Sequence, residues 1–190
     1  MADLLTAEEF QRTLSAIHRP AQPQQFPLLQ QAIEDAEIGS RAELALFLAN
    51  VYHDSDGLQR LAEKDNGKGK EFDGGYRYYG RGYLQIAHIY SYRDASEAVL
   101  GDELILEKRP ERVEKEPQLA WDVAAWVWRE RVKPYGTATL EDTVRSLNSD
   151  ELDGDRSALR RRKQFLRAIN KVLQPTADAG EEACPDENDE

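Results

Sequence analysis

Residues 42–57 read AELALFLANVYHDSDG, an apolar run that ends in a short polar turn. The apolar side chains that recur at helical spacing on one face are Leu44, Phe47, Leu48 and Val51. Such a stripe is typical of a helix that packs against a core, and the serine, acids and glycine after it favour a helix end near residues 54–57. The sequence therefore predicts a central helix that carries His53 and Asp54 at its C-terminus.

The segments that follow this helix are of a different kind. Residues 58–63 are expected to form a short helical turn, and residues 64–75 are too polar and too rich in glycine for regular structure. Residues 76–92, YRYYGRGYLQIAHIYSY, contain six of the eight tyrosines. We expect a short strand or extended piece within residues 76–85.

The rest of the chain predicts further helices, so the fold class is mainly α. Three pairs have the spacing of helix caps: Thr6 with Glu9, Ser40 with Glu43, and Thr139 with Asp142. Besides the central helix, helices are expected near residues 7–17, 27–36, 87–100, 117–133, 140–147 and 155–173, with a connection at 101–115. The expected organisation is one domain of residues 1–173, followed by an acidic, disordered tail of residues 174–190.

Charge and hydropathy exclude two classes of partner. The net charge is −11, but seven of these charges are acids of the last fourteen residues, which contain no Lys or Arg. Without them the folded body carries only −4, so neither a nucleic-acid surface nor a membrane surface is expected. No window approaches the roughly 18 apolar residues that a membrane span needs. We expect a monomer.

Two features bear on the compartment. The N-terminus, MADLLTAEEF, lacks the basic and long apolar regions of a signal peptide. Cys184 is the single cysteine, so no internal disulfide can form. We therefore expect a cytoplasmic protein, unless a leader has been removed from the sequence.

Asp54 and Glu63 are the candidate catalytic pair, nine positions apart. Glycoside hydrolysis needs two carboxyl groups that face across a cleft: one protonates the leaving oxygen, and the other activates water or attacks the sugar. The spacing alone does not single these residues out, because the chain has 36 acids and most acids are solvated surface charges.

The tyrosine-rich segment is the second candidate feature. Sugar rings stack on aromatic faces, and Arg77, Arg81 and Gln85 would supply partners for sugar hydroxyls. The alternative is that the tyrosines pack beneath the long loop before them. The three histidines are far apart and have no ligand-like spacing, so no metal site and no cofactor is expected.

Several segments, in order along the chain, resemble those of family 19 glycoside hydrolases, which include plant endochitinases and some bacterial endolysins. They are FLANVYHDSDGL, then Glu63, then YYGRGYLQIAHIYSY, WDVAAWVW, TVRSLN and RRRKQFLRAINKVL. The resemblance spans about residues 5–173, and its most specific part is YYGRGYLQ.

The resemblance implies a lysozyme-like, bilobal α-helical domain that hydrolyses β-1,4 links between N-acetylglucosamine units with inversion. It assigns Asp54 as the acid and Glu63 as the base that activates water. The positions that match those binding substrate or orienting the acids are His53, Tyr79, Gln85, Tyr90, Asn148 and Arg161. The implied partner is chitin or a related N-acetylglucosamine polymer.

Three positions depart from the family pattern. The family acid is a glutamate, and Asp54 is shorter by one methylene, which withdraws the carboxyl by roughly 1–1.5 Å. Ala87 and Ser91 stand where the family has a serine that helps hold the attacking water and an asparagine. Two interpretations stay open: a chitinase-type hydrolase that turns over slowly, or a catalytically silent glycan- or protein-binding member of the same fold. The choice between chitin and peptidoglycan also stays open.

Overall fold

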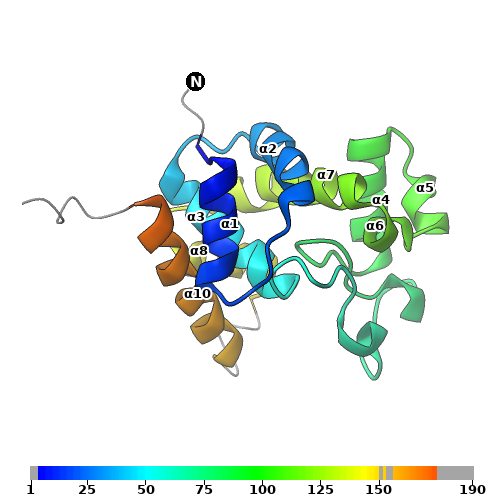
Figure 1. The fold of residues 1–190 in the computed structure, drawn as a ribbon. Coiled ribbons are helices and arrows are strands. Elements are labelled where there is room, and N and C mark those ends of the chain that lie inside the picture. The colour runs from blue at the N-terminus through cyan, green and yellow to red at the C-terminus, as the bar shows by residue number, and fades with distance from the viewer. Residues whose placement is uncertain (1–3, 150–151, 153–155, 175–190) are drawn as a thin grey trace, which may run out of the picture.

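The computed structural model describes residues 4–149, 152 and 156–174, and this part of the chain is mainly helical (Figure 1). The longer helices are α1 (Ala7–Ala16), α2 (Phe26–Asp35), α3 (Arg41–Asp54), α4 (Ile89–Leu100), α7 (Pro117–Val127), α8 (Leu140–Leu147) and α10 (Ser157–Leu173). Two short helices, α5 (Leu104–Lys108) and α6 (Arg112–Lys115), lie between α4 and α7. No strand occurs among the described residues, so the mainly α fold class is confirmed. The predicted tail, with Cys184, lies outside the described residues from residue 175 onward.

The centre of the fold is α3, in which every residue from Leu44 to Tyr52 is buried. The sequence predicted that one face of this helix is buried, whereas in the structure neighbouring helices cover it on all sides. Along it packs α10, which in turn contacts α1, and α8 also contacts α3. From the other direction, the fully buried Trp128 meets the Phe47 ring edge-on, with ring centroids 5.2 Å apart.

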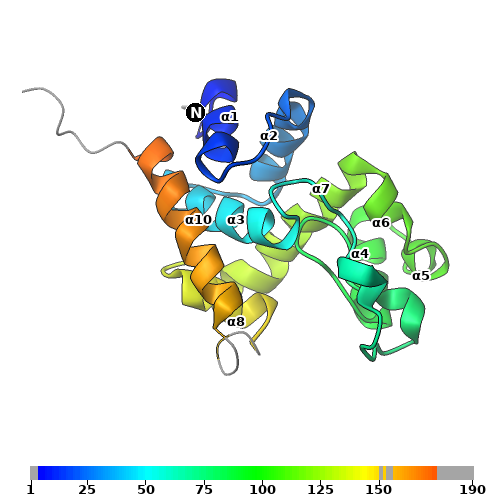
Figure 2. The same ribbon diagram turned by 60° about the horizontal axis from the view of Figure 1, so that its bottom comes forward.

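Two groups of helices lie on either side of α7. Figures 1 and 2 show α1, α3, α8 and α10 together in one group and α4, α5 and α6 in the other. α7 contacts α2 on one side and α4 and α6 on the other, so it joins the two groups. After α7 the chain continues as a π-helical turn, Trp128–Val132, and then a 3-10 turn, Lys133–Tyr135. In the described part of the chain, no helix is both long and apolar enough to cross a membrane.

Two of the predicted caps form as complete capping boxes. Thr6 and Glu9 exchange side chain and backbone hydrogen bonds at the start of α1, and Thr139 and Asp142 do the same at α8. The Ser40 hydroxyl caps α3, but the reciprocal bond does not form. The Glu43 carboxylate instead accepts hydrogen bonds from Gly39 N–H and Trp128 Nε1, because the buried indole needs an acceptor.

Three predicted segments differ from the structure. Residues 58–63 form no helical turn, because Asp56, Gly57 and Leu58 all adopt positive φ and turn the chain back. Residues 76–85 form no strand; they contain a 3-10 turn and two isolated bridges. The connection at 101–115 contains α5 and α6, which are too short to show a helical period.

Candidate active site

A cleft of about 820 Å³ is lined by residues of both helix groups. Its walls come from the end of α3, the long loop between α3 and α4, the segment after α7, the end of α8 and the start of α10. Seven of the eight predicted site residues line it: His53, Asp54, Glu63, Gln85, Tyr90, Asn148 and Arg161. The fold therefore brings together side chains that lie up to 108 positions apart in the sequence, although their roles stay predictions.

Asp54 is the last residue of α3, and its side chain is only 12% exposed. Arg162 Nη2 donates a hydrogen bond to Asp54 Oδ1 at 2.7 Å. Arg162 is itself 1% exposed, and its Nη1 also donates to Asn50 Oδ1 at 3.0 Å. A hydrogen bond between a buried guanidinium and a carboxylate has a defined geometry, so this contact holds the Asp54 side chain in place.

The arginine that bonds to Asp54 is Arg162, the neighbour of the predicted site residue Arg161. Arg161 lines the cleft, but its guanidinium bonds to Asp56 and does not contact Asp54 in any described interaction. One residue turns a helix by about 100°, so neighbouring arginines point to different surroundings. The signal was present, because Arg162, Phe165 and Ile169 have the i, i+3, i+7 spacing of the buried face of α10.

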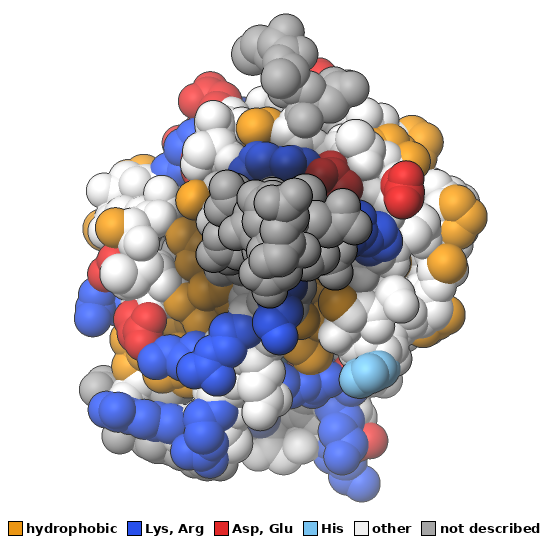
Figure 3. Space-filling view, turned by 60° about the vertical axis from the view of Figure 1, so that its left-hand side comes forward, with side chains coloured by type: hydrophobic (Ala, Val, Ile, Leu, Met, Phe, Trp, Pro, Cys, Tyr) orange, Lys and Arg blue, Asp and Glu red, His pale blue; other side chains and the backbone are white. Residues whose placement is uncertain are grey.

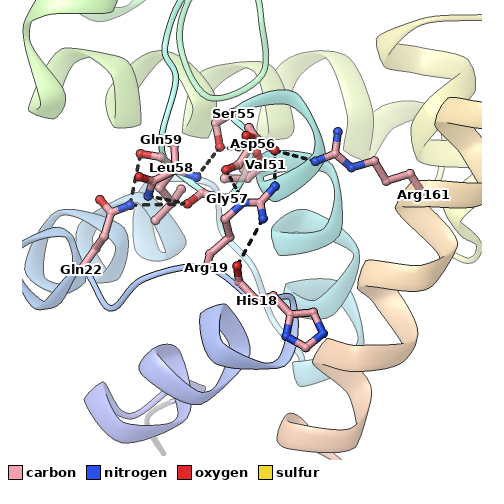
Figure 4. Close-up of polar contacts among 10 residues, drawn as sticks. All are labelled: His18, Arg19, Gln22, Val51, Ser55, Asp56, Gly57, Leu58, Gln59 and Arg161. Atoms are coloured by element: carbon pink, nitrogen blue, oxygen red, sulfur yellow. Dashed lines mark hydrogen bonds and ion pairs between the residues drawn. The ribbon is translucent and has the colours of Figure 1, made fainter.

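Asp56 lies two residues after the candidate acid, and its carboxylate joins this turn to two distant segments of the chain. Figure 4 shows Arg19, from the loop after α1, and Arg161, from α10, both bonded to its carboxylate. Arg19 Nε also donates to the Asp56 carbonyl at 2.9 Å. The Arg19 hydrogen bond, assisted by Arg161, holds the pKa of Asp56 below its usual value. Gly57 follows at φ +68°, and a Cβ there would lie 2.3 Å from Arg19 Cγ, so this turn requires glycine.

Glu63 is held mainly by backbone. Its N–H donates to the Gly80 carbonyl at 2.8 Å, and Gly80 N–H donates to Glu63 Oε2 at 3.2 Å. Lys70 forms an ion pair with the other carboxylate oxygen. The side chain of Glu63 is 19% exposed, whereas that of Lys70 is 65% exposed. The Gly80 backbone thus fixes both the backbone and one carboxylate oxygen of Glu63, and the side chain lines the cleft.

Gly80 and Gln85 complete the wall beside Glu63. A Cβ on Gly80 would lie 3.0 Å from Gln85 Oε1 and 3.4 Å from Glu63 Oε2, so only glycine leaves these two side chains in place. Gln85 has φ +49°, an uncommon value for a residue with a side chain. Its Nε2 donates to the Gly82 carbonyl at 2.7 Å, which fixes the side chain along the cleft.

An aromatic pair forms another part of the cleft lining. The Tyr90 ring is half-exposed and stacks on the His88 ring, with centroids 5.4 Å apart and planes within 10°. His88 Nδ1 accepts a hydrogen bond from Asp73 N–H at 3.0 Å, which fixes the imidazole. The two rings present a flat apolar surface of the kind that sugar rings stack on, and Ala87 beside them brings no side-chain hydrogen bond.

Tyr79 is the predicted site residue that does not line the cleft. Its side chain is buried, its ring lies 3.5 Å from the Arg81 guanidinium, and its hydroxyl donates to Glu114 at 3.2 Å. Burial also raises the pKa of its phenol. Tyr79 therefore packs beneath the loop, which favours the packing alternative at this position, and its assignment as a substrate-binding residue stays a prediction.

Arg131 is a cleft residue that the sequence did not single out. Its Nη1 donates to Ser91 Oγ at 3.0 Å and its Nη2 to Asp94 at 2.9 Å. The guanidinium also lies 4.6 Å from the centre of the Trp126 ring. Ser91, a departure from the family pattern, is thus an anchor for Arg131 in the cleft wall.

Comparisons with known proteins agree with this architecture. The family described as chitinase class I matches residues 64–156. Endochitinase EP3 of Arabidopsis thaliana is 31% identical over 130 residues, which cover 63% of this chain and 46% of EP3. Chitinase C of Streptomyces griseus superposes with a TM-score of 0.66 at 25% identity, over 91% of this chain and 78% of that one. This chain carries a glycoside hydrolase family 19 domain.

The family 19 domain has the lysozyme-like helical fold that the resemblance implied. A class IV chitinase from Zea mays shares this fold, with a TM-score of 0.60 at 22% identity over 91% of this chain and 85% of that one. Chitinase 5 of Oryza sativa is 30% identical over 118 residues, 57% of this chain and 40% of that protein. The chain thus spans less than half the length of the curated relatives it matches, and the family match begins one residue after Glu63.

Proposed function

We propose that this domain hydrolyses β-1,4 links between N-acetylglucosamine units with inversion, at a low rate. The observation that carries the proposal is that Asp54 and Glu63 line one cleft, together with the Tyr90 platform and Gln85. The similarity to proteins named as chitinases supports chitin as the substrate. In this mechanism Glu63 takes a proton from water as it attacks the sugar, and Asp54 gives a proton to the leaving oxygen.

The surroundings of Glu63 suit a general base, whereas those of Asp54 oppose its action as a general acid. Glu63 is oriented by Gly80 N–H and faces the cleft, as a base that positions water requires. Asp54 is close to a cation, and a general acid must be protonated before it can act. The shorter side chain and the pairing with Arg162 both oppose acid catalysis, which is why a low rate is proposed.

Hydrolysis of chitin oligomers by wild type and Glu63→Gln tests this proposal. The variant keeps the shape of the side chain but cannot act as a base, so the rate of reducing-end release is expected to fall by about 10²–10⁴-fold. Glu71→Gln is the matched control, because Glu71 also lines the cleft but is exposed. No release of reducing ends by wild type at high concentration, or full activity of Glu63→Gln, would refute the proposal.

A second candidate is a glycan-binding domain without turnover. The contact that favours it is the buried Arg162–Asp54 pair, which stabilises the form of Asp54 that cannot donate a proton. Calorimetry with chitin oligomers separates the two candidates. Binding without hydrolysis favours the silent domain, and the absence of any binding would favour a protein partner instead.

A further inference from the structure

The cleft contains more cations than anions, although the chain as a whole has a net charge of −11. Among the described residues its lining includes seven Lys or Arg side chains and three acids. An uncharged polymer of N-acetylglucosamine gives no reason for this excess. The contacts of each cation show which of them remain available to a ligand.

Two of the cations are committed to the candidate catalytic acids. Arg162 holds Asp54, and Lys70 holds Glu63. Three more pair with acids that are not part of the lining: Arg161 with Asp56, Arg131 with Asp94, and Arg145 with Asp142. These five positive charges are therefore offset within the protein.

Arg60 and Lys64 are different. Both are exposed and line the cleft, and neither has an ion pair or a side-chain hydrogen bond with any residue that the structure describes. They bracket Glu63 in the sequence, so they lie on the same stretch of loop as the candidate base. Glu71, the third acid of the lining, offsets only one of these two charges.

The adjoining surface extends the positive charge. The described residues of α10 include six Lys or Arg and no acid. Figure 3, in which the side of the molecule carrying α10 comes forward, shows Lys and Arg side chains gathered on this face. A smaller hollow beside the cleft shares Arg145 and Ser149 with it and adds Arg156 and Lys163, against one acid, Glu141. A long ligand leaving the cleft in this direction would stay near cations.

We propose that the cleft prefers a β-1,4-linked N-acetylhexosamine chain that carries carboxylates, and that Arg60 and Lys64 select for this charge. The inference rests on the proposed function and names the substrate class of the same cleft. A cation without an internal partner gains a new interaction when a carboxylate approaches, and a cleft with low-dielectric walls strengthens that attraction. Neither residue takes part in bond cleavage, so both act on binding.

Two soluble polymers with the same backbone test the preference. Carboxymethyl chitin carries carboxylates, whereas glycol chitin is uncharged. Calorimetry with the full chain is expected to give about tenfold tighter binding of carboxymethyl chitin at low salt, and the advantage should shrink as salt screens the charges. Carboxymethyl cellulose, which lacks the acetamido groups, should bind more weakly than carboxymethyl chitin.

Single variants then assign the preference to residues. Arg60→Gln and Lys64→Gln should each reduce the preference by about two- to fivefold, the usual range for one exposed charge pair. Lys68→Gln is the matched control, because Lys68 is an exposed lysine of the same loop that does not line the cleft. It should leave the preference unchanged.

The possible failures are distinguishable. Glycol chitin binding as tightly as carboxymethyl chitin, or equal losses in Lys68→Gln and Lys64→Gln, would overturn the charge preference and leave the proposed function standing. Equal binding of carboxymethyl cellulose would mean that charge alone is recognised, which also overturns the inference. Failure of both chitin polymers to bind would overturn the proposed function itself.

Discussion

The two candidate catalytic carboxyls are held in opposite ways. Asp54 ends a buried helix, and its partner Arg162 is almost completely excluded from water. Glu63 lies on a loop, where it is held by the Gly80 backbone and by a lysine side chain that is 65% exposed. The acid side of the cleft is therefore part of the core, whereas the base side is a local loop structure. Breaking the buried Arg162–Asp54 pair should therefore lower the stability of the domain, whereas changes around Glu63 should affect activity with little loss of stability.

The largest expected effect comes from Arg162→Met. The substitution removes the hydrogen bonds that Arg162 donates to the buried carboxylate of Asp54 and to the amide oxygen of Asn50. Removing one partner of a buried ion pair costs about 3–5 kcal/mol, so the free energy of unfolding in urea should fall by that amount. Lys70→Gln, which removes the exposed partner of Glu63, should change it by less than about 1 kcal/mol. Equal losses in the two variants would contradict the comparison.

The next largest expected effect is a rise in the hydrolysis rate in Asp54→Glu. The added methylene restores the reach of the carboxyl toward the sugar, and a misplacement of this size costs about a hundredfold in rate. Release of reducing ends from chitin oligomers should therefore rise by about that factor. Glu63→Asp, the opposite change at the other carboxyl, should lower it. An unchanged rate in Asp54→Glu would show that reach does not limit turnover.

Gly80→Ala should reduce activity without unfolding the domain. The new methyl group meets the ends of the Glu63 and Gln85 side chains, which can give way by a few tenths of an ångström. Displacement of the base should lower the hydrolysis rate by about tenfold, while the unfolding midpoint stays near that of wild type. Gly39→Ala is the control, because a Cβ there meets no atom within 4 Å. Loss of stability without loss of activity would be inconsistent with the role given to Gly80.

The smallest expected effect is the pH dependence of the stability that Asp56 contributes. Its pKa is lowered in the folded state, chiefly by Arg19, so its contribution to stability is present above the unfolded value of 3.8 and is lost as the pH falls through the folded value. Asp56→Asn should lower the free energy of unfolding by less than about 1 kcal/mol at neutral pH, because the side chain is 36% exposed. In acid, the substitution should leave the free energy of unfolding unchanged. If Asp56→Asn lowers the free energy of unfolding in acid as much as at neutral pH, the ion pairs of Asp56 are not the source of its contribution.

Local signals in the sequence predicted most of the helices. The caps at Thr6 and Thr139 and the apolar periods located the helices that they begin, because these signals depend on residues three or four positions apart. The short helices α5 and α6 gave no such signal. The end of α3 near residues 54–57 was predicted, but the helical turn expected at residues 58–63 does not form, because Asp56, Gly57 and Leu58 adopt positive φ angles in a turn that Arg19 contacts from 37 positions before Asp56.

The candidate site was predictable in its residues more than in its contacts. Seven of the eight predicted residues line the cleft, whereas Tyr79 packs beneath it. The contact between Arg162 and Asp54 could not be predicted: Arg161 and Arg162 lie in the same basic run, and only the position of α10 on α3 decides which one reaches Asp54. Contacts between distant segments are set by packing, and a single sequence does not reveal packing.

The ion pairs that α10 forms with Asp54 and Asp56 have a consequence for the order in which the domain is assembled during synthesis. Asp54 and Asp56 are synthesised long before Arg162 and Arg161, which follow them by 108 and 105 residues, although Arg19, the other partner of Asp56, precedes it by 37 residues. At about 5–20 residues per second, the nascent chain spends several seconds or more with both acids made and these two arginines of α10 absent. The acid side of the cleft is therefore completed only after α10 has been synthesised, and a chain that stops before α10 would contain both candidate catalytic carboxyls but lack Arg162, which bonds to Asp54.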